Sequence, residues 1–107
     1  MKQIIPTELS AWLKDAGRAA PVLLDVREPV EFAHCAIPGS IPMPMASVPA
    51  RMQELEPDAE IVVICHHGGR SMQVAMFLER QGFSNLINLA GGVAQWAAQV
   101  DPSMPQY

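Results

Sequence analysis

The chain of 107 residues lacks the sequence features that are typical of secreted, membrane-spanning and nucleic-acid-binding proteins. It has only two cysteines, too few for a disulfide scaffold. It has no apolar run of membrane-spanning length, and its opening segment, MKQIIPTELS, lacks the apolar stretch of a signal peptide. Basic residues are also scarce, because 7 Lys and Arg stand against 11 Asp and Glu. We therefore expect a cytoplasmic protein with free thiols that binds neither membranes nor nucleic acid.

The apolar content of the chain is sufficient for a folded core. Half of the residues are hydrophobic and 17% are charged, a balance typical of globular domains. The length corresponds to one domain. We expect this domain to span residues 1–100, and the polar, proline-containing segment DPSMPQY, residues 101–107, to form a frayed tail.

Short apolar runs alternate with segments of helical periodicity along the chain. Strands are expected at residues 21–26, 61–65 and 84–89, and helices at residues 6–17, 27–35, 47–55, 71–81 and 93–100. The proline-rich segment 37–45 predicts a loop and a sheet edge, because proline cannot donate to a central ladder. This order predicts an α/β fold with a central parallel sheet and helices on both faces.

The segment IVVICHHGGRS, residues 61–71, joins the clearest strand to a helix. Ligands of such sheets bind beyond the carboxyl ends of the strands, where this loop lies. Gly68 and Gly69 allow positive φ, so that successive backbone N–H groups can converge on an anion. The helix N-terminus adds a partial positive charge, and Arg70 adds a forked cation at the rim. The loop therefore predicts an anion cradle.

Cys65 stands at the base of this predicted cradle. A lone cysteine is usually a small buried hydrophobe, but a ring of N–H donors would favour its thiolate form. We interpret Cys65 as a nucleophile beside an anion-binding loop. The adjacent His66 and His67 could move a proton or add charge. We favour the alternative in which both side chains point outward and only adjust the entrance.

Three motifs, in order, resemble those of single-domain rhodaneses, the thiosulfate-type sulfurtransferases. They are LLDVREPVEFAHCAIPGSIPMPM, CHHGGRS and NLAGGVAQW. The resemblance covers nearly the whole chain and implies the three-layer rhodanese fold. It implies that Cys65 takes sulfur from a small anionic donor such as thiosulfate, carries it as a persulfide, and passes it to cyanide, a thiol or a protein acceptor. No cofactor or metal is implied. The loop residues expected to bind the donor are His66, His67, Gly68, Gly69, Arg70 and Ser71.

Other functions are compatible with parts of the sequence. A persulfide carrier, loaded by a partner protein in a relay for cofactor or tRNA thiolation, would need the same cysteine. The chain also resembles rhodanese domains attached to adenylyltransferases, but it lacks the adenylyltransferase part. Related phosphatases and arsenate reductases place five residues between cysteine and arginine, whereas HHGG supplies four here. A zinc site would need wider ligand spacing than the adjacent His–Cys and Cys–His pairs provide.

Several further residues are assigned structural roles. We expect Asp25 to cap loop N–H groups or to pair with a nearby arginine such as Arg27, because structural ion pairs often mimic functional ones. Cys35 is interpreted as a packed or partly buried bystander. The remaining large apolar side chains expected in the core are Trp12, Met72, Met76, Phe77 and Trp96.

Overall fold

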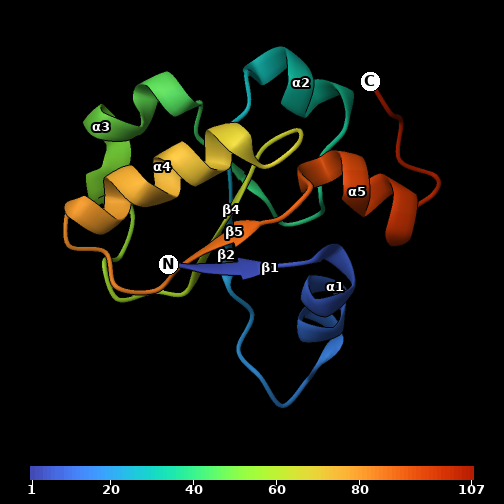
Figure 1. Cartoon of the computed structure of the whole chain (residues 1–107), viewed down its shortest axis with the longest axis horizontal. Helices are drawn as coiled ribbons and strands as arrows, with labels where there is room; N and C mark the ends of the chain where they lie inside the picture. Colours follow the sequence, from blue (N-terminus) through green and yellow to red (C-terminus); the bar gives the residue numbers. More distant parts are fainter.

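A computed structural model describes all 107 residues. A sheet of five parallel strands forms its centre, and Figure 1 shows this sheet between the helices. The strand order is β1-β5-β4-β2-β3, and every neighbouring pair is parallel. The strands are β1 (Lys2–Ile4), β2 (Val22–Asp25), β3 (Ile41–Pro42), β4 (Ile61–Ile64) and β5 (Leu86–Leu89). The predicted strands are confirmed, and the proline-rich segment supplies the edge strand β3.

Helices cover both faces of the sheet, as the alternating pattern predicts. They are α1 (Pro6–Lys14), α2 (Pro29–His34), α3 (Val48–Arg51), α4 (Gly69–Arg80) and α5 (Gly92–Gln99), with 3₁₀ turns at Met45–Ser47 and Met52–Glu54. Helices α1 and α5 pack on one face, whereas α3 and α4 pack on the other (Figure 1). The short helix α2 buries none of its residues. The predicted three-layer α/β architecture is confirmed.

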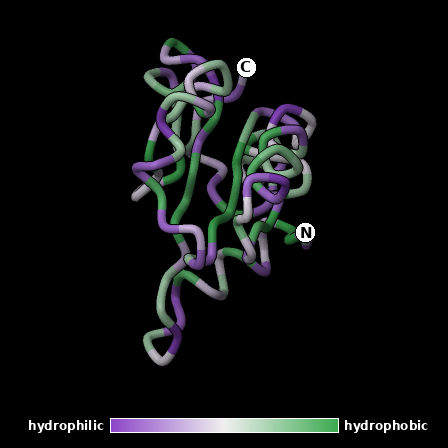
Figure 2. Tube along the Cα trace, turned by 90° about the vertical axis from the view of Figure 1, so that its left-hand side faces the viewer, coloured by the Kyte–Doolittle hydropathy of each residue, from purple (hydrophilic) through white to green (hydrophobic).

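Strand β4 is buried on both faces because it lies in the middle of the sheet. Its side chains alternate, so Val62 and Ile64 join the core beneath α1 and α5, whereas Ile61 and Val63 join the core beneath α4. Each such buried side chain contributes about 2 kcal/mol of hydrophobic stabilisation. Figure 2 shows hydrophobic stretches of the trace running through the middle of the molecule. This rigid central strand carries the candidate site at its carboxyl end.

Two local expectations are wrong. The sequence analysis missed β1, because three residues with two polar side chains show no periodicity; the strand exists through its pairing with β5. Met76 is 46% exposed and Met72 only half-buried, although both were expected in the core. Helix α4 buries only the face that carries Val74 and Leu78, so its other apolar residues remain near the surface.

The segment 101–107 is not frayed. Met104 is buried in the core formed with α1 and α5. The hydroxyl of the last residue, Tyr107, donates a hydrogen bond to Glu31 of α2. A polar composition predicted disorder, but one methionine and one tyrosine anchor the segment to the domain.

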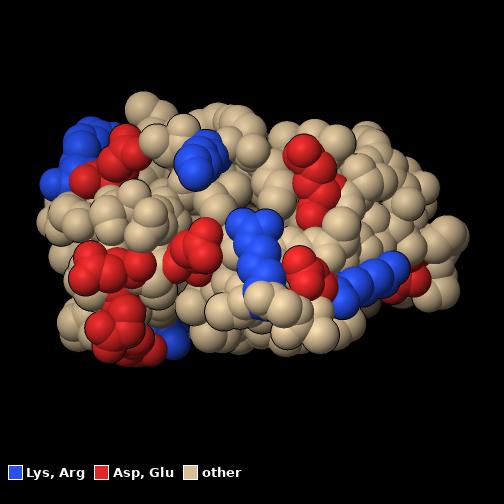
Figure 3. Space-filling view, turned by 90° about the horizontal axis from the view of Figure 1, so that it is seen from below, with Lys and Arg blue, Asp and Glu red and all other residues tan.

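The surface shows no large region of one charge on the face drawn in Figure 3, where acidic and basic side chains are interspersed. None of the helices has both the length and the apolar character needed to cross a membrane.

Candidate active site

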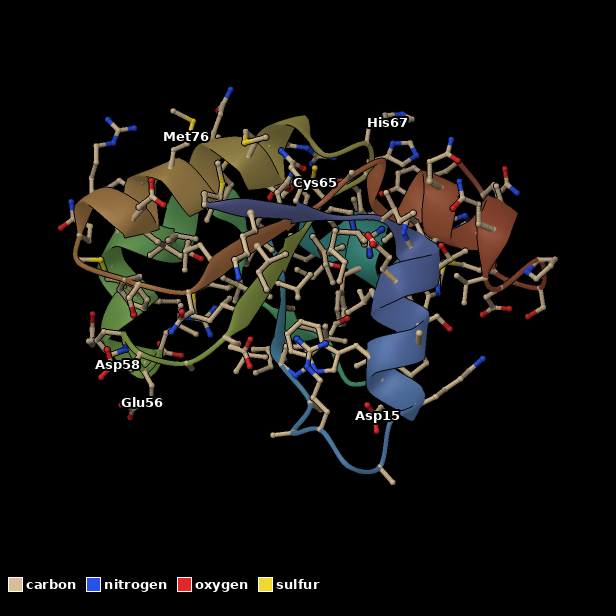
Figure 4. All side chains as sticks on the ribbon, turned by 60° about the horizontal axis from the view of Figure 1, so that its bottom comes forward. Asp15, Glu56, Asp58, Cys65, His67 and Met76 are labelled. Atoms are coloured by element: carbon tan, nitrogen blue, oxygen red, sulfur yellow. The ribbon has the colours of Figure 1, made fainter.

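Cys65 follows β4 directly and lies where the sheet ends and α4 begins (Figure 4). The residue is only 1% exposed. Its Sγ accepts a hydrogen bond from the backbone N–H of Gly68, with a nitrogen–sulfur distance of 3.0 Å. This backbone donor holds the sulfur at the base of the loop between β4 and α4. The geometry therefore supports a nucleophilic role for Cys65.

Gly68 has the left-handed conformation that the loop requires, with φ of +107°. A Cβ at this position would lie 3.3 Å from the backbone nitrogen of Gly91, so a larger residue would also crowd the next loop. Gly69 begins α4 and does not have a positive φ. The expectation that both glycines use positive φ is confirmed for Gly68 and wrong for Gly69.

The N-terminus of α5 forms hydrogen bonds to carbonyl groups of the loop that contains Cys65 and His66. The backbone N–H of Val93 donates to the Cys65 carbonyl oxygen at 2.9 Å, and that of Ala94 donates to the His66 carbonyl oxygen at 3.0 Å. Gly92, with φ of +58°, lies so close that a Cβ would overlap both carbonyl oxygens. Gly92, the first residue of α5, therefore allows the close approach that fixes the orientation of the loop peptides, a role not expected from the sequence.

A buried polar pair supports the loop from beneath. The hydroxyl of Ser71 donates to the Gly68 carbonyl oxygen at 3.1 Å, and the Asn88 amide donates to the same oxygen at 3.3 Å. Ser71 and Asn88 also contact each other. The Ser71 side chain thus faces inward, which leaves only its N–H for the predicted cradle. Sequence reasoning missed Asn88, although one polar residue in an otherwise apolar strand was an available signal.

The predicted anion cradle has donors in the first turn of α4. The N–H groups of Gly69, Arg70 and Ser71 have no carbonyl acceptor inside the helix, because the first turn of any helix lacks one. These donors and the helix dipole favour negative charge at this end of α4. The arrangement can stabilise an anion next to the Cys65 sulfur.

Arg70 is at the rim of the loop, but its charge is already paired. Its Nη1 and Nη2 donate to the two carboxylate oxygens of Glu31, at 2.7 and 2.9 Å. The Glu31 side chain is 17% exposed and that of Arg70 is 37% exposed. The bonds from Arg70 lower the pKa of Glu31 to about 2. The sequence analysis missed Glu31, which comes from α2 on a distant part of the chain.

Tyr107 connects this ion pair to His66. Its hydroxyl accepts a hydrogen bond from Arg27 at 2.8 Å and donates one to Glu31 at 2.9 Å. Its ring stacks on the His66 ring, with centroids 3.8 Å apart and planes 9° from parallel. Burial, and then the neighbouring charge of His67, lower the pKa of His66. The expected outward position is confirmed for exposed His67 and wrong for half-buried His66.

Asp25 and Arg27 form a fully buried ion pair beneath the site. Their closest nitrogen–oxygen distance is 2.7 Å, and both side chains are 0% exposed. Arg27 also donates to the Cys35 carbonyl oxygen at 2.6 Å. Cys35 is 8% exposed and packs in the core on the α1 and α5 side, whereas Cys65 packs on the other side. The expected pairing of Asp25 with Arg27 and the packed position of Cys35 are confirmed.

The Glu31–Arg70 pair should make stability depend on acidic pH. The folded-state pKa of Glu31 lies below its usual 4.5, so its contribution is present above about pH 4.5 and disappears as pH falls towards 2. We expect Glu31→Gln to cost about 1 kcal/mol near neutral pH, because the pair is partly exposed, and almost nothing near pH 2. Urea unfolding of both proteins across this range measures the difference. A stability gap that does not change with pH would contradict the assignment.

Comparison with known proteins identifies related sequences for most of the chain. The family model described as the rhodanese-like domain matches residues 6–99. A "Sulfurtransferase" of Allochromatium vinosum is 40% identical over 76 residues, which are 71% of either chain. "Thiosulfate sulfurtransferase GlpE" of Pseudomonas syringae is 36% identical over 92 residues, covering 86% of this chain and 84% of the relative.

Solved structures agree with these sequence relationships. The crystal structure of a rhodanese-like domain protein from Staphylococcus aureus has a TM-score of 0.85 and 27% identity, and the match covers 100% of this chain and 99% of the other. A protein from Staphylococcus saprophyticus has a TM-score of 0.84 and 34% identity, with 94% and 97% of the two chains covered. The fold and the family resemblance predicted from the motifs are confirmed.

Proposed function

The chain belongs to the rhodanese-like domain family of sulfurtransferases, and from this premise we propose that it transfers sulfane sulfur through a persulfide on Cys65. The observation that carries the proposal is the hydrogen bond from the Gly68 N–H to the Cys65 sulfur. It is supported by the relatives named as sulfurtransferases. Because the Cys65 side chain is nearly buried, it favours donors whose reactive sulfur is a terminal atom that can enter the loop.

The reaction has two steps of the ping-pong type. With thiosulfate as the assay donor, the Cys65 thiolate attacks its outer sulfur, the sulfur–sulfur bond breaks, and sulfite leaves with the bonding electrons. The enzyme then carries a Cys65 persulfide anion. Cyanide or a thiolate attacks the outer sulfur of this persulfide, and the Cys65 thiolate is restored as the leaving group. Charge and electrons are therefore conserved in both steps.

The loop would stabilise each anionic species in turn. In this proposal the Gly68 N–H, which bonds to the Cys65 sulfur, acts together with the N–H groups in the first turn of α4, which have no helical acceptor. Fixed backbone donors cost no reorganisation when charge develops on the transferred sulfur. In this proposal His66 and His67 shape the entrance, and neither acts as a general acid or base.

A persulfide carrier loaded by a partner protein is the second candidate. It uses the same Cys65 chemistry but replaces thiosulfate with a protein-bound persulfide. The observation that favours it is the pairing of Arg70 with Glu31, which leaves no unpaired guanidinium for a small dianion. The same pairing, together with the short loop between Cys65 and Arg70, disfavours the phosphatase and arsenate reductase alternative.

Intact-mass measurement after incubation with a sulfur donor tests the proposal. We expect the reduced protein to gain one sulfur atom from thiosulfate, or from a cysteine desulfurase supplied with cysteine, and to lose it when cyanide is added. A gain from the desulfurase alone would favour the carrier. If neither donor adds sulfur, a persulfide route through Cys65 is contradicted.

A further inference from the structure

We infer that Glu31 is a specificity-determining residue, which selects donors of low charge by neutralising Arg70 at the rim of the Cys65 loop. The inference rests on the proposed function, because it concerns the donor of the same reaction. It assigns the donor to the class of sulfane-sulfur compounds with at most one negative charge, such as an alkyl persulfide, rather than to dianions.

Glu31 is held in place by more than its partner on the loop. Both of its carboxylate oxygens bond to Arg70. One of them also accepts the backbone N–H of Glu28 at 3.0 Å, and the other accepts the Tyr107 hydroxyl at 2.9 Å. A carboxylate with donors from three other residues loses little entropy on pairing, unlike a mobile surface ion pair. The Glu31–Arg70 ion pair is therefore a fixed part of the loop rim.

The charged side chains around the rim balance one another. Asp25, Arg27, Tyr107, Glu31 and Arg70 form one continuous hydrogen-bonded series from the core to the loop. The series contains two carboxylates and two guanidinium groups, so its net charge is zero. Burial lowers the pKa of His66, which disfavours a positive charge on the adjoining imidazole. The remaining positive potential comes from the backbone N–H groups.

This balance has a direct effect on the choice of donor. A dianion is attracted twice as strongly as a monoanion by an unpaired cation, so it loses more when that cation is neutralised. A persulfide of the form R–S–SH needs no such cation. The Cys65 thiolate attacks its outer sulfur, the sulfur–sulfur bond breaks, and R–S⁻ leaves with the bonding pair, while Cys65–S–SH forms. The loop donors alone can support this step.

Two donors that differ by one charge test the inference. Thiosulfate is a dianion, and methanethiosulfonate has a methyl group in place of one charged oxygen. In a ping-pong reaction, kcat/KM for the donor reports only the loading of Cys65. We expect Glu31→Gln to raise kcat/KM about 10-fold for thiosulfate and at most about 3-fold for methanethiosulfonate, because the freed guanidinium acts on twice the charge. The gain for thiosulfate should shrink as salt is added.

Two further variants separate charge at the rim from other effects. Glu54→Gln removes a carboxylate from the exposed pair with Arg51, so it changes net charge equally outside the loop. It should leave the ratio of kcat/KM for the two donors at the parent value. Glu31→Asp retains the negative charge at the rim. This variant should keep the parent ratio of kcat/KM for the two donors even if the variant protein is less stable.

The possible results distinguish this inference from the proposed function. An unchanged donor ratio in Glu31→Gln, or an equal rise for both donors, would overturn the role of Glu31 while the sulfurtransferase proposal stands. An equal shift of the ratio in Glu54→Gln would overturn it as well, because net charge would then explain the effect. Failure of the parent protein to accept sulfur from these two donors and from a cysteine desulfurase supplied with cysteine would instead count against the proposed function.

Discussion

Replacement of Cys65 with serine is expected to abolish sulfur transfer, with a loss of at least about 1,000-fold in kcat. A serine hydroxyl is not ionised near neutral pH, and oxygen cannot hold the persulfide. The variant should fold normally, because the smaller oxygen can still accept the Gly68 N–H that bonds to sulfur in the parent. Thiocyanate formation measures the rate, and intact mass shows whether sulfur is retained on the protein.

Cys35→Ser is the matched control for this prediction. Cys35 is 8% exposed and packs in the core on the α1 and α5 side, away from the core that contains Cys65. We expect this variant to retain more than about half of the activity and to lose about 1 kcal/mol of stability. An equal loss of transfer in both variants would contradict the assignment of Cys65 as the sole sulfur carrier.

Gly92→Ala is expected to damage the site without altering any residue proposed to react. An added methyl group would overlap the carbonyl oxygens of Cys65 and His66. Helix α5 would have to withdraw, which breaks the bonds from the Val93 and Ala94 N–H groups to the loop. We expect a loss of about 2–4 kcal/mol in the free energy of unfolding, as for overpacking in a core. Transfer should fall about 100-fold, because the loop donors would no longer converge beside Cys65.

Gly82→Ala is the control for the backbone conformation alone. Gly82 also has a positive φ, of +98°, but a Cβ there would meet nothing within 4 Å. Its replacement should cost only about 1 kcal/mol for the left-handed conformation and should leave transfer unchanged. Denaturant unfolding and thiocyanate assays of the two variants make the comparison. Similar losses in both would show that close packing against the loop is unimportant.

The loop around Cys65 could be located from sequence because the signals for it are local. An uninterrupted apolar run is typical of a central parallel strand, and β4 has that place. A glycine near the start of the following helix predicted the turn that Gly68 makes. The cysteine lies between these two signals, so its position at the strand end followed from short-range patterns alone.

The environment of the loop could not be predicted in the same way. Arg70 and Glu31 are 39 residues apart in the chain, and Tyr107 and Glu31 are 76 apart. No periodicity or turn signal relates such positions, because their contact depends on how α2, α4 and the last residues pack around one sheet. For this reason, local patterns predicted a free cation at Arg70 and a frayed tail at residues 101–107, whereas both are held by distant contacts.

The amino-acid sequence by itself determined the class of the fold, the position of Cys65 at the end of the central strand and the turn at Gly68 that places a backbone donor on its sulfur. These features depend on apolar periodicity and on the conformational freedom of glycine, which act over a few residues. Only the tertiary structure decided the charge of the rim, the support of the loop by Gly92 and Asn88, and the docking of Tyr107 on His66. Those depend on distances between remote segments, and pairing at a distance of a few ångströms converts Arg70 from a free charge into half of a neutral pair.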